Sequence, residues 1–249
     1  MISKNQIKQI KQLEMKKYRQ RENLFVAEGP KVVNDLLTRW QPVSLFATDD
    51  FVPCQPVSIQ SITNDELRKV SFLQHPQQVI AIFQIPASTS NTLPDEKDLT
   101  LALDGIQDPG NLGTIIRLAD WFGIKDIVCS EETADAWNPK VVQATMGSIA
   151  RVNISYTSLT DIFSRLPHDF PIYGTLLDGE DIYQQPLTKG GIIVMGNEGN
   201  GLTEKVRQRV NRRLLIPSYR ADDTAESLNV AIATAIVCAE FRRRGSACL

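Results

Sequence analysis

Short apolar runs alternate with helix-like segments from residue 99 to the end of the chain, and this alternation most restricts the possible fold. Continuous apolar strands separated by helices are typical of a mainly parallel sheet covered on both faces. The sequence therefore predicts an α/β domain over 99–249. The expected strands are Leu99–Leu103, Ile124–Cys129, Ile172–Leu177, Ile192–Met195 and Arg213–Pro217, and the expected helices are 112–122, 137–147, 159–166, 203–211 and 224–244.

The first 85 residues predict a smaller α/β unit. Ser3 and Gln6 form a capping-box pattern, and Ile7, Ile10 and Leu13 follow at helical spacing. A second helix is expected over 31–40, and strands over 43–47, 57–62 and 79–83. Residues 86–98 contain two prolines, several Ser, Thr and Asn, and an acidic end, which is the composition of a linker. The expected domains are thus 1–85 and 99–249.

Charge is distributed unevenly along the chain. The 249 residues carry a formal net charge of −2, which by itself argues against a strongly basic nucleic-acid binder. Residues 1–85 nevertheless carry 11 basic and 8 acidic side chains, residues 99–201 carry 6 and 13, and residues 202–249 carry 9 and 5. The basic ends could meet a polyanion. Residues 1–21 contain seven basic side chains and one acidic side chain. This basic segment is either a solvated helix face or an RNA contact made through Lys16, Lys17, Arg19 and Arg21.

Several classes of protein are disfavoured. The four cysteines and two histidines have no zinc-site spacing, so no metal is expected. The longest apolar run, Val230–Ala239, is shorter than the roughly 20 residues that a membrane span needs. The N-terminal residues lack the apolar segment of a signal peptide. We therefore expect a cytoplasmic protein with reduced thiols and no membrane association.

Three polar loops each follow an expected strand, where parallel sheets bind ligands. The first, Asp104–Arg117, places Asn111 as a helix cap and Arg117 in an otherwise apolar stretch, where it is either an ordinary surface arginine or a ligand contact. The second, Gly196–Gly201, has three glycines but neither dinucleotide nor P-loop spacing. The third, Ile216–Val230, places Ser227 and Asn229 at the start of an apolar helix.

Together these loops resemble the signature motifs of the SpoU (TrmH-like) family of RNA ribose 2′-O-methyltransferases, in the SPOUT superfamily. The matching segments are DPGNLGTIIRLADWFG, IVMGNEGNGL and IPSYRADDTAESLNVAIATAI, in the family's order and spacing. The segment KKYRQRENLFVAEGPKVV is similar to the substrate-binding domain that precedes this catalytic domain, a unit resembling ribosomal protein L30e. The polar stretch 220–224 departs from the pattern and puts the shape of the third loop in doubt.

The resemblance implies a C-terminal trefoil-knot domain, a homodimer and S-adenosylmethionine as cofactor. The family's polar functional residues map to Asn111, Arg117, Glu198, Ser227 and Asn229. Its cofactor-binding positions map to Thr175, Leu176, Gly196, Ile216 and Leu228. In the family proposal the motif-one arginine, here Arg117, is the base. Because a guanidinium normally stays protonated, we prefer a role in binding RNA phosphate and stabilising alkoxide charge.

The expected function is therefore 2′-O-methylation of structured RNA, with ribosomal RNA favoured over transfer RNA. A non-catalytic RNA-binding protein with a retired catalytic domain is a competing hypothesis, although all five polar motif residues are intact. A small-molecule enzyme on an ordinary doubly wound fold is disfavoured because the dinucleotide fingerprint is absent.

Overall fold

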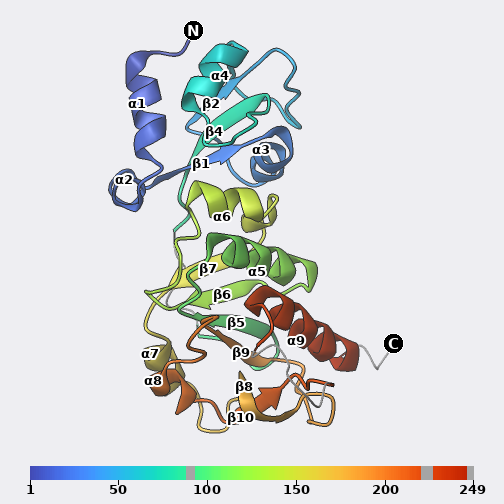
Figure 1. Ribbon diagram of the computed structural model, residues 1–249. Coiled ribbons are helices and arrows are strands. Elements are labelled where there is room, and N and C mark those ends of the chain that lie inside the picture. The colour runs from blue at the N-terminus through green and yellow to red at the C-terminus, as the bar shows by residue number, and fades with distance from the viewer. Residues whose placement is uncertain (88–92, 220–226, 246–249) are drawn as a thin grey trace. The chain divides into compact units, whose positions relative to one another are not determined.

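The computed structural model describes residues 1–87, 93–219 and 227–245, and it divides the chain into two compact units (Figure 1). Unit 1 comprises residues 1–87 and 135–150, and unit 2 comprises 88–134 and 151–249. The sequence analysis predicted a single domain over 99–249. In the structure, the inserted segment 135–150 groups with unit 1 instead. Part of the expected linker, 88–92, lies outside the described residues.

Unit 1 is built on a four-stranded sheet in the order β1-β4-β2-β3. The central strand β4 pairs antiparallel with both β1 and β2, and the short β3 pairs parallel with β2. Its elements are α1 (Lys4–Gln12), α2 (Lys16–Glu22), β1 (Leu24–Glu28), α3 (Pro30–Leu37), β2 (Ser44–Ala47), β3 (Gln60–Ser61), α4 (Asn64–Val70), β4 (Val79–Gln84), α6 (Pro139–Ala144) and a 3₁₀ turn at Ser148–Ala150.

Alternating side chains on the strands of unit 1 supply two apolar faces. Val26 of β1 and Ile80 and Ile82 of β4 join a core that includes Ile10 of α1 and Leu67 of α4. Both helices begin with the reciprocal capping box, at Ser3 as expected and at Thr63.

The other face carries an aromatic cluster that includes the inserted segment. The Phe25 ring centroid lies 4.8 Å from that of Trp137, 5.7 Å from that of Phe83 and 6.1 Å from that of Trp40. Packing of the half-buried Trp137 ring against the buried Phe25 explains why 135–150 belongs to unit 1.

Arg19 does not form part of a surface open to RNA, contrary to the expectation from its basic surroundings. Its side chain is 1% exposed and forms an ion pair with Asp135. The guanidinium Nε donates to Asp135 Oδ2 at 2.9 Å, and Nη1 donates to the carbonyls of Leu13 and Glu14. These bonds hold α2 and the inserted segment in one unit, so the role of Arg19 is structural.

Unit 2 contains a six-stranded parallel sheet in the order β10-β8-β9-β5-β6-β7. The α/β fold class expected from the apolar runs is confirmed. Its elements are β5 (Leu99–Asp104), α5 (Pro109–Trp121), β6 (Asp126–Cys129), β7 (Asn153–Tyr156), α7 (Leu159–Ser164), β8 (Ile172–Asp181), β9 (Gly191–Gly196), α8 (Glu204–Arg207), β10 (Arg212–Leu215) and α9 (Val230–Gly245).

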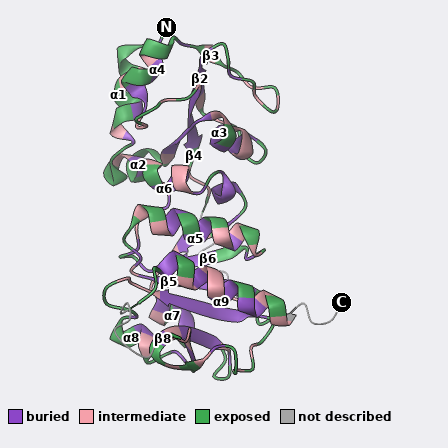
Figure 2. Cartoon of the chain, turned by 45° about the vertical axis from the view of Figure 1, so that its right-hand side comes forward, coloured by how far each residue is buried: buried purple, intermediate pink, exposed green. Residues whose placement is uncertain are grey.

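Helices cover both faces of this sheet. Apolar side chains of α7 and of the α8 region, including Phe163 and Val206, pack with Ala102 and Val194 of the sheet. Helices α5 and α9 pack against each other, with contacts to β6 and β9 respectively (Figures 1 and 2). Strands β5 and β9 are buried along almost their whole length because they lie between these layers.

Most element boundaries differ from expectation by a few residues, and the strands β1 and β7 and the helix α4 were not expected. β1 is an apolar run that the sequence analysis did not single out, whereas β7 has only one buried residue. The helix expected over 224–244 is described from Val230, because 220–226 lie outside the described residues. Among the described residues, no helix is long and apolar enough to cross a membrane.

The Arg19–Asp135 pair should be essential to the stability of unit 1. Asp135→Ala leaves the buried guanidinium without its carboxylate, so we expect a loss of about 3 kcal/mol in the free energy of unfolding. Urea unfolding followed by tryptophan fluorescence measures it, because Trp40 and Trp137 of unit 1 are half-buried whereas Trp121, the third tryptophan, is already 83% exposed. The control Glu22→Ala breaks the exposed pair with Arg21 and should cost less than about 1 kcal/mol. Equal losses in the two variants would refute the structural role.

Candidate active site

The three polar loops predicted from the sequence follow β5, β9 and β10, three strands of one parallel sheet. In register, Asp104 at the end of β5 pairs with Gly196 at the end of β9. The loops that begin at these residues therefore start side by side at the carboxyl edge of the sheet, where α/β proteins bind ligands.

The cap of α5 determines what Asn111 can do. The sequence suggested Asn111 as the cap, but the N-cap is Asp108, whose Oδ1 accepts from the backbone N–H of Asn111 at 2.8 Å. Pro109 occupies the first helical position, where its missing N–H costs nothing. Because Asp108 caps the helix, the side-chain amide of Asn111 is available for other partners.

Asn111 connects two loops through its side chain. Its Nδ2 donates to Glu198 Oε1 at 2.7 Å, and its Oδ1 accepts from Asn229 Nδ2 at 2.9 Å. Asn229 Oδ1 in turn accepts from the N–H groups of Ala231 and Ile232, and so caps α9. The result is a polar chain, Glu198–Asn111–Asn229, that joins all three predicted motifs.

Two residues that the sequence interpretation did not single out shape these loops. Asn197 Nδ2 donates to the Gly105 carbonyl at 2.8 Å, while its Oδ1 accepts from the N–H groups of Gly199 and Asn200. The buried Asp104 accepts from the N–H of Thr203 at 2.6 Å. An Asn after a strand and before glycines is the available sequence signal for such a turn.

The remaining two predicted polar residues stand apart from the chain. Arg117 is exposed on α5 and forms no hydrogen bond or ion pair with any described residue. Ser227 is exposed next to 220–226, the part of the third loop that the structure does not describe. The polar stretch 220–224, whose shape was in doubt, falls in the same gap.

Four of the five predicted cofactor positions lie in or directly after the adjacent strands β8, β9 and β10, and the fifth, Leu228, lies just before α9. Arg213 of β10 pairs with Gly174 and Leu214 pairs with Glu180, so residues 175–179 of β8 form a bulge. Thr175 in this bulge donates to the Val194 carbonyl at 3.3 Å, and Leu176 is buried. Gly196 ends β9 and Ile216 follows β10, both half-buried.

None of the five predicted cofactor positions has a charged side chain, which suits the uncharged ring of a ligand. Leu228 is 50% exposed and Leu177 of the bulge is 76% exposed, so both side chains could contact such a ring. Backbone groups and one hydroxyl supply the polarity at the five predicted positions. Among the described residues, no cluster of His, Cys, Asp and Glu gathers that could hold a metal ion.

Close packing requires glycine at position 196. A Cβ added there would lie 2.4 Å from the carbonyl carbon of Gly201 and 2.6 Å from the backbone N of Leu202. The backbone N–H and carbonyl of Asn197 exchange hydrogen bonds with those of Gly201, which closes the loop tightly on itself. The second motif is therefore a compact turn that presents Glu198 toward Asn111.

A parallel α/β domain with three joined loops at its carboxyl edge, preceded in the chain by a smaller α/β unit, belongs to the class of α/β proteins that bind ligands at the ends of their strands. Comparison with known proteins makes the class specific. Residues 98–239 match the SpoU rRNA Methylase family, and residues 4–81 match the MRM3-like substrate binding domain. The chain belongs to the SpoU family.

Relatives resemble the chain over nearly its full length. The 23S rRNA (guanosine(2553)-2′-O)-methyltransferase RlmP of Bacillus subtilis is 32% identical over 96% of this chain and 97% of its own. A putative RNA methyltransferase of the TrmH family from Porphyromonas gingivalis has a TM-score of 0.86 at 40% identity, over 98% of this chain and 99% of its own. The AdoMet-bound rRNA methyltransferase from Sinorhizobium meliloti has a TM-score of 0.83 at 30% identity, over 98% and 97%.

The expected SPOUT fold class is thus confirmed, with the smaller α/β domain before the catalytic one. The trefoil knot expected in this fold involves the chain that follows β10. Residues 220–226 of that segment lie outside the described residues.

Two glycines of the second motif should respond differently to the same change. Gly196→Ala forces backbone to shift and should lower the free energy of unfolding by about 1–3 kcal/mol. Gly199→Ala places its Cβ no closer than 3.6 Å to the nearest atom, Asn197 Oδ1, and should be nearly neutral. Thermal unfolding of the two variants measures the difference; an equal shift in melting temperature would contradict the packing argument.

Proposed function

We propose that this protein methylates the 2′-hydroxyl of a ribose in ribosomal RNA, with S-adenosylmethionine as the methyl donor. The observation that carries the proposal is the Glu198–Asn111–Asn229 chain, which joins the three family motifs in one place. The full-length relative from Bacillus subtilis is named as a 23S rRNA 2′-O-methyltransferase, which favours ribosomal over transfer RNA.

The cofactor fits the edge formed by β10, β8 and β9. Thr175, Leu176, Gly196, Ile216 and Leu228 would hold it through backbone groups and apolar side chains. S-adenosylmethionine supplies an activated methyl group, so the protein has to position the ribose and manage one proton. The related Sinorhizobium meliloti structure is described as AdoMet-bound, which supports S-adenosylmethionine as the cofactor.

Arg117 is the residue proposed to act on the RNA. Its exposed guanidinium has no ion-pair partner among the described residues, so it is available to a phosphate or to the oxygen that loses its proton. A guanidinium at the developing alkoxide stabilises negative charge without itself changing protonation, and the proton of the 2′-hydroxyl passes to solvent water as the oxygen is methylated. We assign Arg117 this electrostatic role in preference to that of a base.

The polar chain is proposed to orient the ribose. The amides of Asn111 and Asn229 hold each other, and Glu198 fixes the amide of Asn111 from the second loop. Ser227 precedes α9 and would complete the ribose contacts from the third loop. Hydrogen-bond donors and acceptors that are fixed in this way can position the ribose hydroxyl, and they add no unpaired charge beside the cofactor positions.

We propose that the protein acts in the cytoplasm and forms a homodimer, in which α5 and α9 of one copy contact the second copy. Trp121 of α5 is 83% exposed and Ile232 of α9 is 54% exposed, on two helices that pack together (Figure 2). The start of α9 lies beside the start of α5, through Asn229 and Asn111, and Arg242 of α9 donates to the Phe122 carbonyl after α5. Trp121 and Ile232 therefore lie toward opposite ends of the helix pair, and the proposed surface runs along its length. Arg117 lies one helical turn before Trp121, so this surface would bring it close to the second copy. Sedimentation velocity tests the assembly.

Removing the guanidinium tests the proposed chemistry. Arg117→Ala should lower the rate of methyl transfer to ribosomal RNA by about 100-fold or more, because a charge-stabilising group is lost. Binding of S-adenosylmethionine, measured by calorimetry, should be unchanged. Arg165→Ala, which removes an exposed arginine after α7, serves as the control. Near wild-type turnover of Arg117→Ala would exclude both roles considered for it.

The basic side chains of α2 that remain exposed should contribute to RNA affinity. Lys16, Lys17 and Arg21 are exposed, and Lys17 and Arg21 lie over the ring of Tyr18 at 5.0 and 4.8 Å from its centroid. Changing all three to Ala should weaken RNA binding. The slope of log affinity against log salt concentration should fall by about 0.7–0.9 for each phosphate that the protein no longer neutralises. Filter binding at several salt concentrations measures this slope.

A triple variant of equal charge provides the comparison. Lys31, Arg39 and Lys69 are exposed elsewhere in unit 1, and their replacement by Ala should leave the slope nearly unchanged. Equal effects of both triple variants would show only a general effect of charge and would refute a specific contact through α2.

A further inference from the structure

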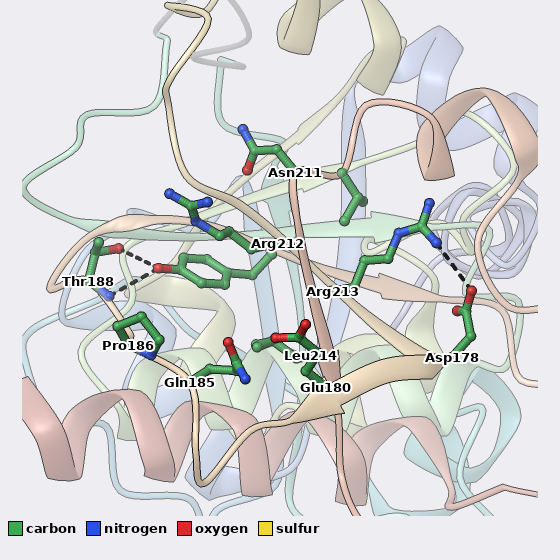
Figure 3. A pocket seen from close by; sticks show the side chains of 11 residues that line it. Asp178, Glu180, Gln185, Pro186, Thr188, Asn211, Arg212, Arg213 and Leu214 are labelled. Carbon is green, nitrogen blue, oxygen red and sulfur yellow. Dashed lines mark hydrogen bonds and ion pairs between the residues drawn. The ribbon is translucent and has the colours of Figure 1, made fainter.

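Unit 2 contains a cavity of about 610 Å³ that shares no residue with the polar chain. It lies beside β10, the edge strand of the sheet (Figure 3). The residues that matter for its chemistry are Asp178, Glu180, Gln185, Thr188, Arg212 and Arg213. Its volume is within the range of small-ligand pockets, roughly 300–1,000 Å³.

One part of the cavity is cationic. Residues 204–215 contain five basic side chains and one acidic side chain. Arg213 forms an ion pair with Asp178 at 3.2 Å, and Arg207 pairs with the same carboxylate. Arg212 points away from Asp178 in Figure 3, is exposed, and forms no ion pair or hydrogen bond with a described residue. A free guanidinium remains at the rim, and phosphate is the anion that its planar fork binds best.

The opposite part of the cavity accepts hydrogen bonds. Glu180 and Gln185 lie at the end of the cavity away from Asn211 (Figure 3). The carboxylate of Glu180 has no hydrogen-bond or ion-pair partner among the described residues. A carboxylate accepts two parallel hydrogen bonds from a base edge that presents neighbouring N–H groups, and guanine N1–H and N2–H₂ form such an edge.

Asn211 is not available as a ligand contact. Its Nδ2 donates to the Phe170 carbonyl at 2.8 Å and its Oδ1 accepts from the N–H of Ile172 at 3.0 Å. These bonds fix the start of β8 against the start of β10. Because Arg213 and Asp178 pair with each other, Arg212 and Glu180 are the two charged side chains of the cavity that can bind a ligand.

We propose that this cavity binds one unpaired guanosine nucleotide of the substrate RNA, with its phosphate on Arg212 and its base edge on Glu180. The cavity shares no residue with the Glu198–Asn111–Asn229 chain, and we assign to it a nucleotide other than the one that is methylated. Single-stranded nucleotides are recognised in this way, by an arginine at the backbone and acceptors at the base edge. This inference rests on the proposed function, methylation of RNA, and it adds a second RNA contact on unit 2.

Binding of labelled RNA hexamers by the full-length protein tests the site directly. The probes are an adenosine hexamer with one guanosine and the same hexamer with inosine, which lacks the 2-amino group. Wild type should prefer the guanosine hexamer several-fold. Arg212→Ala should weaken binding of both probes about five- to tenfold and lower the salt slope by about 0.7. Glu180→Gln should abolish the preference for guanosine.

Lys125→Ala is the charge-matched control, because Lys125 is exposed and precedes β6, four strands from β10 in the sheet. It should bind both hexamers as wild type does. Absence of hexamer binding to wild type, or equal binding by wild type and Arg212→Ala, would overturn the proposal. Loss of guanosine preference in Lys125→Ala would overturn it as well.

A methyl-transfer assay on the same proteins separates this inference from the proposed function. If wild type methylates ribosomal RNA while Arg212→Ala binds the hexamers normally, the cavity proposal fails and the function stands. If wild type transfers no methyl group but shows the predicted hexamer binding, the function fails and the cavity proposal is supported as a nucleotide site.

Discussion

The parallel pairing of β5 with β9 is the constraint on which the site depends. Its register runs from Leu99–Gly191 to Asp104–Gly196, so both strands end at the same level. The loops that follow are then close enough for Asn197 to reach the Gly105 carbonyl and for Glu198 to reach Asn111. A shift of one residue in this register would turn every side chain of one strand to the other face and separate these partners.

The site that results has two chemically different parts. Its fixed part consists of neutral amides and one carboxylate that satisfy one another and hold three loops together. Its free part is Arg117, a charge with no partner among the described residues. This division suits a reaction in which the donor is already activated. The protein can then contribute mainly by orientation and by stabilising charge on the attacking oxygen.

The sequence predicted the features that arise from local patterns. Five of the six strands of unit 2 and the capping box at Ser3 follow from apolar runs and side-chain oxygens, and the described residues contain them. The three loops follow from their polar residues and glycines, and the described parts of all three meet in the polar chain. The sequence could not show that Asp108 rather than Asn111 caps α5, because both residue types cap helices well. It also could not show that Asp135, 116 residues after Arg19, would bury that arginine. Because Arg19 pairs with a residue far away in the sequence, an arginine in a basic helix is buried in unit 1 and is not exposed to solvent.

The central claim is that this chain transfers a methyl group to a ribose of ribosomal RNA. The most direct measurement incubates the protein with S-adenosylmethionine labelled in its methyl group and with total cellular RNA, then maps the labelled nucleotides. The account predicts label in ribosomal RNA, at a position where alkali fails to cleave because the 2′-oxygen is methylated. Absence of label from every RNA fraction, or label on a base in place of a ribose, would contradict it.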